Sequence, residues 1–212
     1  MTPNKELKKQ ALELLKGNRT KLALAVLMYF AAVLACGILS LIWLGTVLQY
    51  ILLPPFIVGL HICFLKLIRN KTVKTSDMLD GIGMMRGSIA LYFVNSLLLA
   101  LWSLLLIVPG WIKGYSYALS YHVLIDNPDM TQSEAREESI RLMEGNKMRL
   151  FLLDLSFIGW HLLSLLTGGL LYLWVIPYIQ TTFALFYDEL KQKKPRQGIY
   201  VPLETAEDTA NG

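Results

Sequence analysis

The sequence predicts an all-α membrane protein: a polytopic helical bundle of about six transmembrane helices in three repeated helix-hairpin units. Three observations lead to this fold, namely long apolar runs, basic residues on one side of those runs, and a motif that recurs along the chain. Hydrophobic residues make up 54% of the 212 residues and the mean hydropathy is +0.46, too apolar for an ordinary soluble domain. Helices satisfy their own backbone hydrogen bonds, as a bilayer requires.

Six apolar runs approach the length of a membrane span. A helix needs about 20 apolar residues to cross the hydrocarbon of a bilayer. The first three runs meet that length, and residues flanking the shorter fourth and fifth runs can extend them. We expect one transmembrane helix from each of Leu22–Trp43, Thr46–Leu67, Ser88–Val108, Trp111–Ile125, Leu150–Leu166 and Leu170–Tyr187.

Lys and Arg lie on one side of these runs, in segments 5–21, 66–86, 136–149 and 191–196, with Lys113 as the exception. Short loops rich in Lys and Arg stay in the cytoplasm during insertion, so both termini are expected to be cytoplasmic. The net charge of +4 suits an anionic inner leaflet. Because no basic stripe with interleaved aromatic residues occurs, we expect a lipid bilayer as partner and no nucleic acid.

A short motif recurs before three of the runs. Leu15–Leu22 and Met143–Leu150 share Gly, Asn, two basic residues and Leu at the same spacing, and Met85–Ser88 is a weaker copy. Each copy follows a short amphipathic segment that we expect to form an interfacial helix on the basic side. Thr131 and Glu134 form a capping box before the third segment. The expected faces are Leu7, Ala11, Leu14 and Leu15, then Met78, Leu79, Ile82 and Met85, then Ala135, Ser139, Leu142 and Asn146.

Prolines mark the second helix of each unit. Pro54-Pro55, Pro109 and Pro177 are placed near expected helix starts, where the missing N–H costs little. Apolar residues also precede Pro54 and Pro177, so each proline either kinks a span or separates a half-helix from it. We therefore expect one membrane domain over residues 1–190, followed by a disordered cytoplasmic tail. The three units are about 4–70, 75–126 and 131–190, and the tail is 191–212.

Ionisable residues inside apolar runs are costly and so suggest function. Asp154 lies only about 7–8 Å along the helix from Arg149, where it suits a structural anchor as well as a proton or ligand role. Counting along the runs places His122 in the inner half, level with Asp154, and His61 and His161 in the outer half. We therefore hypothesise a contact between His122 and Asp154.

The fourth run is the most polar. Lys113 lies close enough to the outer surface to snorkel toward it. Ser116 and Ser120 lie beside a stripe of Lys and Tyr, and such a face packs against protein or lines a wet cavity. The candidate intramembrane polar cluster is Lys113, Tyr117, Tyr121, His122, Asp154 and His161.

Catalytic, cofactor and metal sites are not expected. The sequence has no Ser/His/Asp arrangement, Gly-rich phosphate loop or Cys pair at metal spacing. Cys36 and Cys63 both lie in apolar runs, where small buried hydrophobic residues are the ordinary role. The histidines lack a spacing that puts zinc ligands on one helical face.

The second half of the chain contains a specific set of strings, which are Ile107–Lys113, Asp126–Asp129, Leu152–Trp160, Trp174–Tyr178 and Phe186–Leu190. This set resembles a family of bacterial integral membrane proteins catalogued as domain of unknown function 975. The resemblance is clearest from Leu98 to Leu190. It implies a multi-spanning protein of a bacterial cytoplasmic membrane with no established activity. The family is distantly similar to the membrane domain of some glycerophosphodiester phosphodiesterases, which is not their catalytic part.

We expect a non-enzymatic membrane protein that binds or organises a lipid, a membrane-protein partner or a second copy of itself. The alternative is a small transporter or permease, favoured by the repeat, the proline-broken spans and the polar fourth run. A continuous mid-membrane cavity lined by Tyr117, Tyr121, His122 and Asp154 would favour transport, and a dry interior would favour binding. An intramembrane enzyme using Asp154 and a histidine is a third class, with less support.

Overall fold

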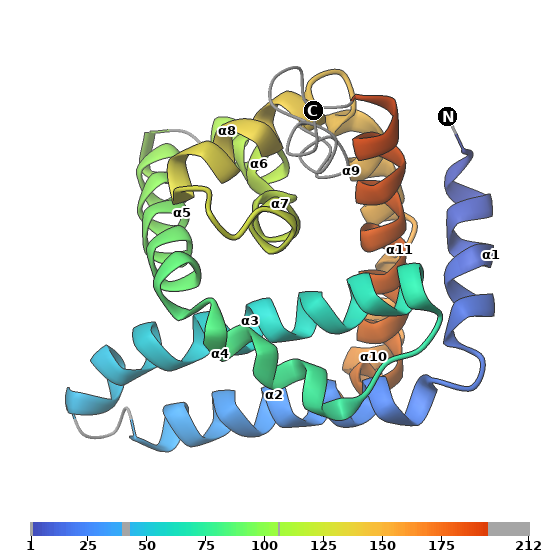
Figure 1. Ribbon diagram of the computed structural model, residues 1–212, viewed down its shortest axis with the longest axis horizontal. Coiled ribbons are helices and arrows are strands. Elements are labelled where there is room, and N and C mark those ends of the chain that lie inside the picture. The colour runs from blue at the N-terminus through green and yellow to red at the C-terminus, as the bar shows by residue number, and fades with distance from the viewer. Residues whose placement is uncertain (1, 40–42, 106, 195–212) are drawn as a thin grey trace, which may run out of the picture.

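The computed structural model describes residues 2–39, 43–105 and 107–194, and this part of the chain is all-α, as predicted (Figure 1). The first third contains α1 (Asn4–Leu15), α2 (Arg19–Leu39) and α3 (Trp43–Asn70). The middle contains the 3-10 helix η1 (Thr75–Leu79), α4 (Asp80–Gly83), α5 (Met85–Leu105), α6 (Ile107–Tyr117) and α7 (Ser120–Asp126). The last third contains α8 (Gln132–Met143), α9 (Lys147–Leu155), α10 (Ile158–Leu166) and α11 (Tyr172–Lys193).

Four stretches of the described residues are long and apolar enough to cross a membrane: Arg19–Ile38, Gln49–Asn70, Met85–Ser103 and Lys147–Leu166. These four candidate spans indicate a multi-pass membrane protein. The predicted fourth and sixth spans are not among these four. The predicted fourth span is divided between α6 and α7, and α11, which contains the predicted sixth span, ends in a charged segment. Lys191 and Lys193 belong to that helix and not to a disordered tail, whereas residues 195–212 lie outside the described part.

The predicted fourth span is interrupted because a serine of α8 enters its backbone. The Ser139 hydroxyl donates to the Ser116 carbonyl at 2.8 Å and accepts from the Leu119 N–H at 3.2 Å. These two bonds replace helical ones at the junction of α6 and α7. The predicted fifth span is also divided, between α9 and α10 at Ser156 and Phe157.

The prolines do not divide the helices that contain them. α3 continues through Pro54 and Pro55, and α11 continues through Pro177. The Thr181 hydroxyl donates to the carbonyl of Pro177 at 2.6 Å in the buried interior. Of the two possibilities left open by the sequence, the structure therefore has single helices and no separate half-helices.

The two stronger copies of the motif have the same backbone turn. Lys16 has φ −62° and ψ 123°, and Glu144 has φ −63° and ψ 122°. The following glycines, Gly17 and Gly145, have φ of +86° and +76°, a region that favours glycine. In the weaker copy Gly87 lies inside α5 instead, so this copy lacks the glycine turn of the other two.

The predicted faces of α1 and α8 are the packed faces, but the face predicted for the middle segment is only half right, because Met78 is buried and Leu79 and Ile82 are not. Leu79 and Ile82 are 48% and 47% exposed. Backbone contact explains the difference, because α4 lies directly against α3. A Cβ atom on Gly81 would lie 2.1 Å from the Pro55 carbonyl oxygen, and one on Gly59 would lie 1.9 Å from the carbonyl oxygen of Met78.

The short helices pack on the longer ones. α1 lies beside α11, η1 and α4 lie on α3, and α8 lies on α6 and α7. α2 and α3 pack side by side and run across the directions of α5 and α11 (Figure 1), so the helices do not form a parallel bundle. α3 is the central element, with 61% of its apolar window buried.

Candidate functional site: a junction of three helices

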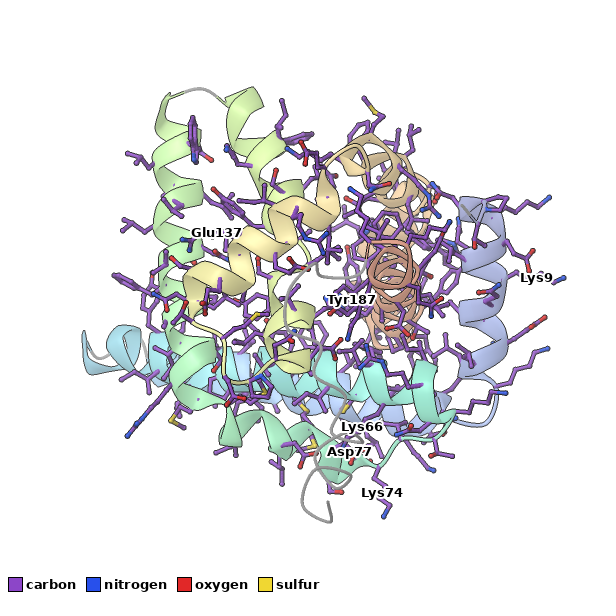
Figure 2. All side chains as sticks on the ribbon, turned by 45° about the horizontal axis from the view of Figure 1, so that its top comes forward. Lys9, Lys66, Lys74, Asp77, Glu137 and Tyr187 are labelled. Carbon is purple, nitrogen blue, oxygen red and sulfur yellow. The ribbon has the colours of Figure 1, made fainter. Side chains whose placement is uncertain are left out.

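The ends of α3, α7 and α11 meet at the carboxylate of Asp126, the last residue of α7. Asp126 accepts hydrogen bonds from both terminal nitrogens of Arg69 at 2.6 and 2.9 Å. It also accepts from the Tyr187 hydroxyl at 2.8 Å and from the Lys191 ammonium at 2.6 Å. The Asp126 side chain is only 4% exposed, and Figure 2 places Tyr187 on α11 in the middle of the molecule. We call these residues the Asp126 junction.

Charge balance keeps Asp126 ionised. Burial alone would raise its pKa, but hydrogen bonds from Arg69, Lys191 and Tyr187 outweigh burial and hold the pKa at about 2. Arg69 also pairs with Asp188 at 2.7 Å. One guanidinium from α3 therefore joins carboxylates from α7 and α11, an arrangement suited to Arg because its planar group offers several donors.

A stack of buried rings leads away from the junction. The ring centroids of Tyr187 and His122 are 5.2 Å apart, and those of His122 and His61 are 4.7 Å apart. Tyr121 meets His61 edge-on at 5.5 Å. His61 therefore lies level with His122, not with His161 as counting along the runs predicted. Among the described residues, Nδ1 of His122 is buried without a hydrogen-bond partner.

Asp154 lies elsewhere. Its carboxylate accepts from the Tyr115 hydroxyl at 2.9 Å, and the hypothesised contact with His122 is not formed. Tyr115 lies on α6 and Asp154 on α9, so the pair joins the predicted fourth and fifth spans at a different point.

The other members of the predicted polar cluster are also dispersed. The Lys113 ammonium lies over the Trp102 ring at 5.1 Å, and Nδ1 of His161 lies 3.3 Å from the Tyr172 hydroxyl. Tyr117 is buried at the end of α6. Only Tyr121 and His122 come together, and they do so around His61. That all six residues share a function stays a prediction.

The sequence predictions did not include the Asp126 junction. Arg69 and Asp126 lie at the ends of α3 and α7, and Asp188 lies near the end of α11. Opposite charges at corresponding positions were the available signal. What the sequence lacked was the distance between units, which tertiary packing sets.

A second cluster attaches α1 to the last unit. Glu189 pairs with Arg149 at 2.7 Å and Lys193 at 2.6 Å, and accepts from the Thr2 N–H at 2.8 Å. Burial alone would raise the pKa of Glu189, but these three donors lower it to about 2. This cluster links α1, α9 and α11.

A similar charged contact fastens η1 and α4 to α3. The Lys66 ammonium lies 2.9 Å from Asp77 and 2.7 Å from Asp80. Figure 2 shows Lys66 and Asp77 next to each other. In the described residues no three His, Cys, Asp or Glu side chains gather where they could hold a metal ion.

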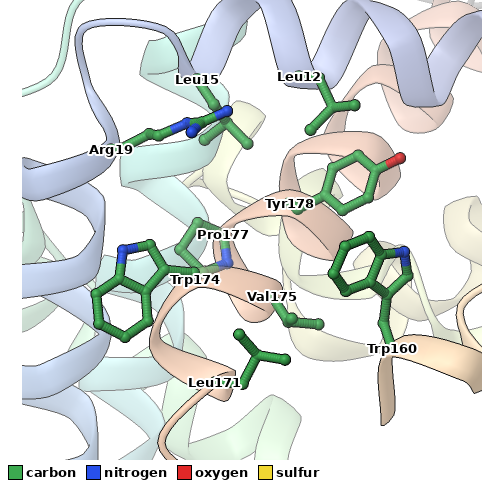
Figure 3. Close-up of a pocket in the computed structure, with 9 residues that line it drawn as sticks. All are labelled: Leu12, Leu15, Arg19, Trp160, Leu171, Trp174, Val175, Pro177 and Tyr178. Atoms are coloured by element: carbon green, nitrogen blue, oxygen red, sulfur yellow. The ribbon is translucent and has the colours of Figure 1, made fainter. Parts of the chain in front are cut away.

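An apolar hollow of about 160 Å³ lies between α1 and the α10–α11 hairpin (Figure 3). Leu15, Val175 and Tyr178 are its buried walls, and Trp160 and Trp174 are half-exposed at its edge. The residues that line it are Leu12, Leu15, Arg19, Trp160, Leu171, Trp174, Val175, Pro177 and Tyr178. We call this space the α1 hollow.

Comparison with known proteins identifies the second half of the chain. Residues 90–194 match a family described as protein of unknown function (DUF975). The family resemblance is confirmed over this segment. No curated protein and no solved structure matches the chain. The DUF975 segment supplies Asp126, Tyr187 and Asp188, whereas Arg69 and His61 come from the part before it. The Asp126 junction therefore joins the DUF975 segment to the first third of the chain.

Proposed function

We propose that this chain is a non-enzymatic, multi-pass membrane protein that binds or organises a lipid or a membrane-protein partner. The observation that carries the proposal is the exposure of its apolar helices. Only 22%, 17% and 22% of the apolar windows in α2, α5 and α9–α10 are buried by the rest of the chain. Apolar surface of this extent needs a covering other than water, and lipid or a partner supplies it.

We further propose six crossings, formed by three hairpins with both termini in the cytoplasm of a bacterial cell. The order of elements supports this arrangement, because a short helix precedes a pair of long helical segments three times. The matching turns at Gly17 and Gly145 support a repeat. In the structure the α2–α3 hairpin crosses the other two, so the six-crossing arrangement requires its own test.

Topology reporters provide that test. Fusions after Trp43, Gly110 and Gly168 should all report a periplasmic position, and the full-length carboxyl terminus should report the cytoplasm. A cytoplasmic signal from any of the three internal sites would overturn the six crossings. Membrane fractionation with an alkaline carbonate wash tests the broader claim, because a protein released by the wash would not be integral.

Binding is tested on the purified full chain. We expect a defined lipid or protein to remain bound in mild detergent and to be recovered in a lipidomic and proteomic inventory. The matched control is the Asp126→Ala variant, in which the junction of α3, α7 and α11 is broken. If an unrelated membrane protein, purified in the same way, carries the same lipids and proteins in equal amounts, the proposal is contradicted.

Transport is the second candidate, and the buried histidine pair favours it. His61 and His122 are adjacent, and the ring stack continues through Tyr187 to Asp126. Histidines and carboxylates in such series are the components of proton relays. In proteoliposomes, His122→Phe should abolish any proton flux that His161→Phe leaves intact. Equal flux in both variants would remove the support for transport.

A further inference from the structure

Of the described residues that line the α1 hollow, Arg19 alone is charged. Arg19 lines the hollow, and within the described residues no ion pair or hydrogen bond of its side chain is present. The segment from Lys5 to Lys21 carries six basic residues and only Glu6 and Glu13 as acidic ones. An adjoining hollow shares Leu12 and Tyr178 and is lined by basic residues of α1, namely Lys5, Lys8 and Lys9.

The walls of the hollow belong to elements that are suited to a membrane. Arg19 begins the candidate span of α2, and Trp160 lies within the candidate span Lys147–Leu166. Trp174 is 56% exposed and Trp160 is 42% exposed. Half-exposed indole rings beside a cation are typical of the level where lipid headgroups meet hydrocarbon.

Apolar walls and a cationic edge match the two parts of one kind of molecule. Leu15, Val175 and Tyr178 offer an apolar surface to a hydrocarbon chain, and Arg19 offers paired N–H donors to a phosphate. Figure 3 shows the guanidinium of Arg19 beside Leu15 and above Pro177 and Trp174. A phospholipid without net negative charge would leave the net positive charge of the segment from Lys5 to Lys21 without a counter-charge.

We propose that the α1 hollow binds an anionic phospholipid, with its phosphate on Arg19 and part of an acyl chain against Leu12, Trp160 and Val175. The proposal rests on the proposed membrane function and specifies its ligand. It does not rest on the six crossings, because Arg19 and Trp174 line one hollow although that arrangement would put them near opposite faces of the bilayer. It also assigns a role to α1, whose Leu12 and Leu15 line the hollow and whose Lys5, Lys8 and Lys9 line the adjoining one.

The experiment uses the full chain purified in mild detergent, with phosphatidylglycerol and phosphatidylcholine as probes and native mass spectrometry as readout. The wild type should retain phosphatidylglycerol in preference to phosphatidylcholine. Arg19→Gln should weaken phosphatidylglycerol binding about fivefold, since one basic residue near the headgroup contributes a factor of that size. Arg86→Gln is the matched control, because Arg86 is also an exposed arginine at the start of a candidate span.

A second pair of variants tests the apolar part. Leu12→Trp should fill the hollow and reduce binding of both lipids, whereas Leu27→Trp should not. Both leucines are exposed, at 40% and 48%, so neither substitution should prevent folding.

The outcomes separate this proposal from the broader one. Equal lipid binding by Arg19→Gln and Arg86→Gln, with the protein still integral to the membrane, would overturn the lipid site alone. Release of the wild type by a carbonate wash would overturn the membrane function and the lipid site together. A loss of phosphatidylglycerol that appears only in Arg19→Gln and Leu12→Trp would support both.

Discussion

The two ends of three long helical segments, α2, α5 and α9–α10, differ sharply in how far their side chains are buried. In α5, Leu91 is fully buried, whereas Leu101 is 57% exposed. The same change occurs from Leu22 to Leu34 in α2, and from Leu153 to Leu166 along α9 and α10. The buried ends are those that follow the short helices α1, α4 and α8 along the chain, and the exposed ends are the far ends of the same segments. We call these the inner and outer regions.

The difference indicates which contacts hold the fold together. In the inner region, apolar packing, ion pairs and glycine contacts join all three units. In the outer region, apolar side chains have few neighbours from the chain itself, and lipid is the natural covering. Stability in detergent should therefore depend on the inner region, and membrane insertion on the outer region.

The largest expected contrast is between two leucines of one helix. Leu91→Ala should lower the free energy of unfolding by about 3–4 kcal/mol, because it leaves a cavity in the inner region. Leu101→Ala should change it by less than about 0.5 kcal/mol, because its side chain faces outward. Denaturant titration in mild detergent measures both values. Similar losses in the two variants would contradict the division into regions.

The Asp126 junction should come next. Asp126→Ala leaves Lys191 and Tyr187 without their acceptor and Arg69 with Asp188 alone, and should cost about 3 kcal/mol. Asp154→Ala removes a single hydrogen bond from Tyr115 and should cost about 1 kcal/mol. The same titration compares the two. If Asp154→Ala lowers the free energy of unfolding by more than Asp126→Ala does, Asp154, which the sequence predicted, contributes more to stability than the Asp126 junction.

The contact of α4 with α3 gives a third test with a built-in control. Gly81→Ala should cost about 2–3 kcal/mol, because its Cβ would meet the backbone of Pro55 and Gly59. Gly83→Ala should be neutral or slightly stabilising, because nothing lies within 4 Å of its added Cβ. Thermal unfolding followed by circular dichroism distinguishes them, and equal midpoints would argue against the close contact.

Acid should also weaken the inner region, because it neutralises Asp126. The pKa of Asp126 is about 2 in the folded protein, below the value near 3.9 of an unperturbed Asp. The stabilisation that ionised Asp126 gives the folded protein is therefore complete above about pH 5 and is lost as the pH falls toward 2. Wild-type protein should lose about 2 kcal/mol more than Asp126→Asn over that range. Parallel pH profiles for both proteins would show that the junction does not titrate as described.

Parts of the fold were predictable because they depend on neighbours in the sequence. The faces of α1 and α8 follow helical spacing, and the capping box at Thr131 and Glu134 is present with the Glu134 N–H donating to the Thr131 hydroxyl at 3.3 Å. The Gly168-Gly169 turn also forms, with both φ values positive. In each case a few adjacent residues contain all the information that the local structure needs.

The candidate site was less predictable. Counting along the runs assigns depth only if the helices are straight, parallel and equally deep. α2 and α3 instead run across the other long helices, and α6 and α7 are separated where Ser139 enters. His61 therefore reaches His122, and Asp154 reaches Tyr115, neither of which the counting anticipated.

The sequence by itself determined the helical content, the apolar segments and the one-sided distribution of positive charge, because composition and spacing act locally along the chain. Only the tertiary structure decided which charged ends meet, where serine interrupts a helix and which glycines lie in contact. Those outcomes depend on the angles and distances between helices that are far apart in sequence, and side-chain packing sets these.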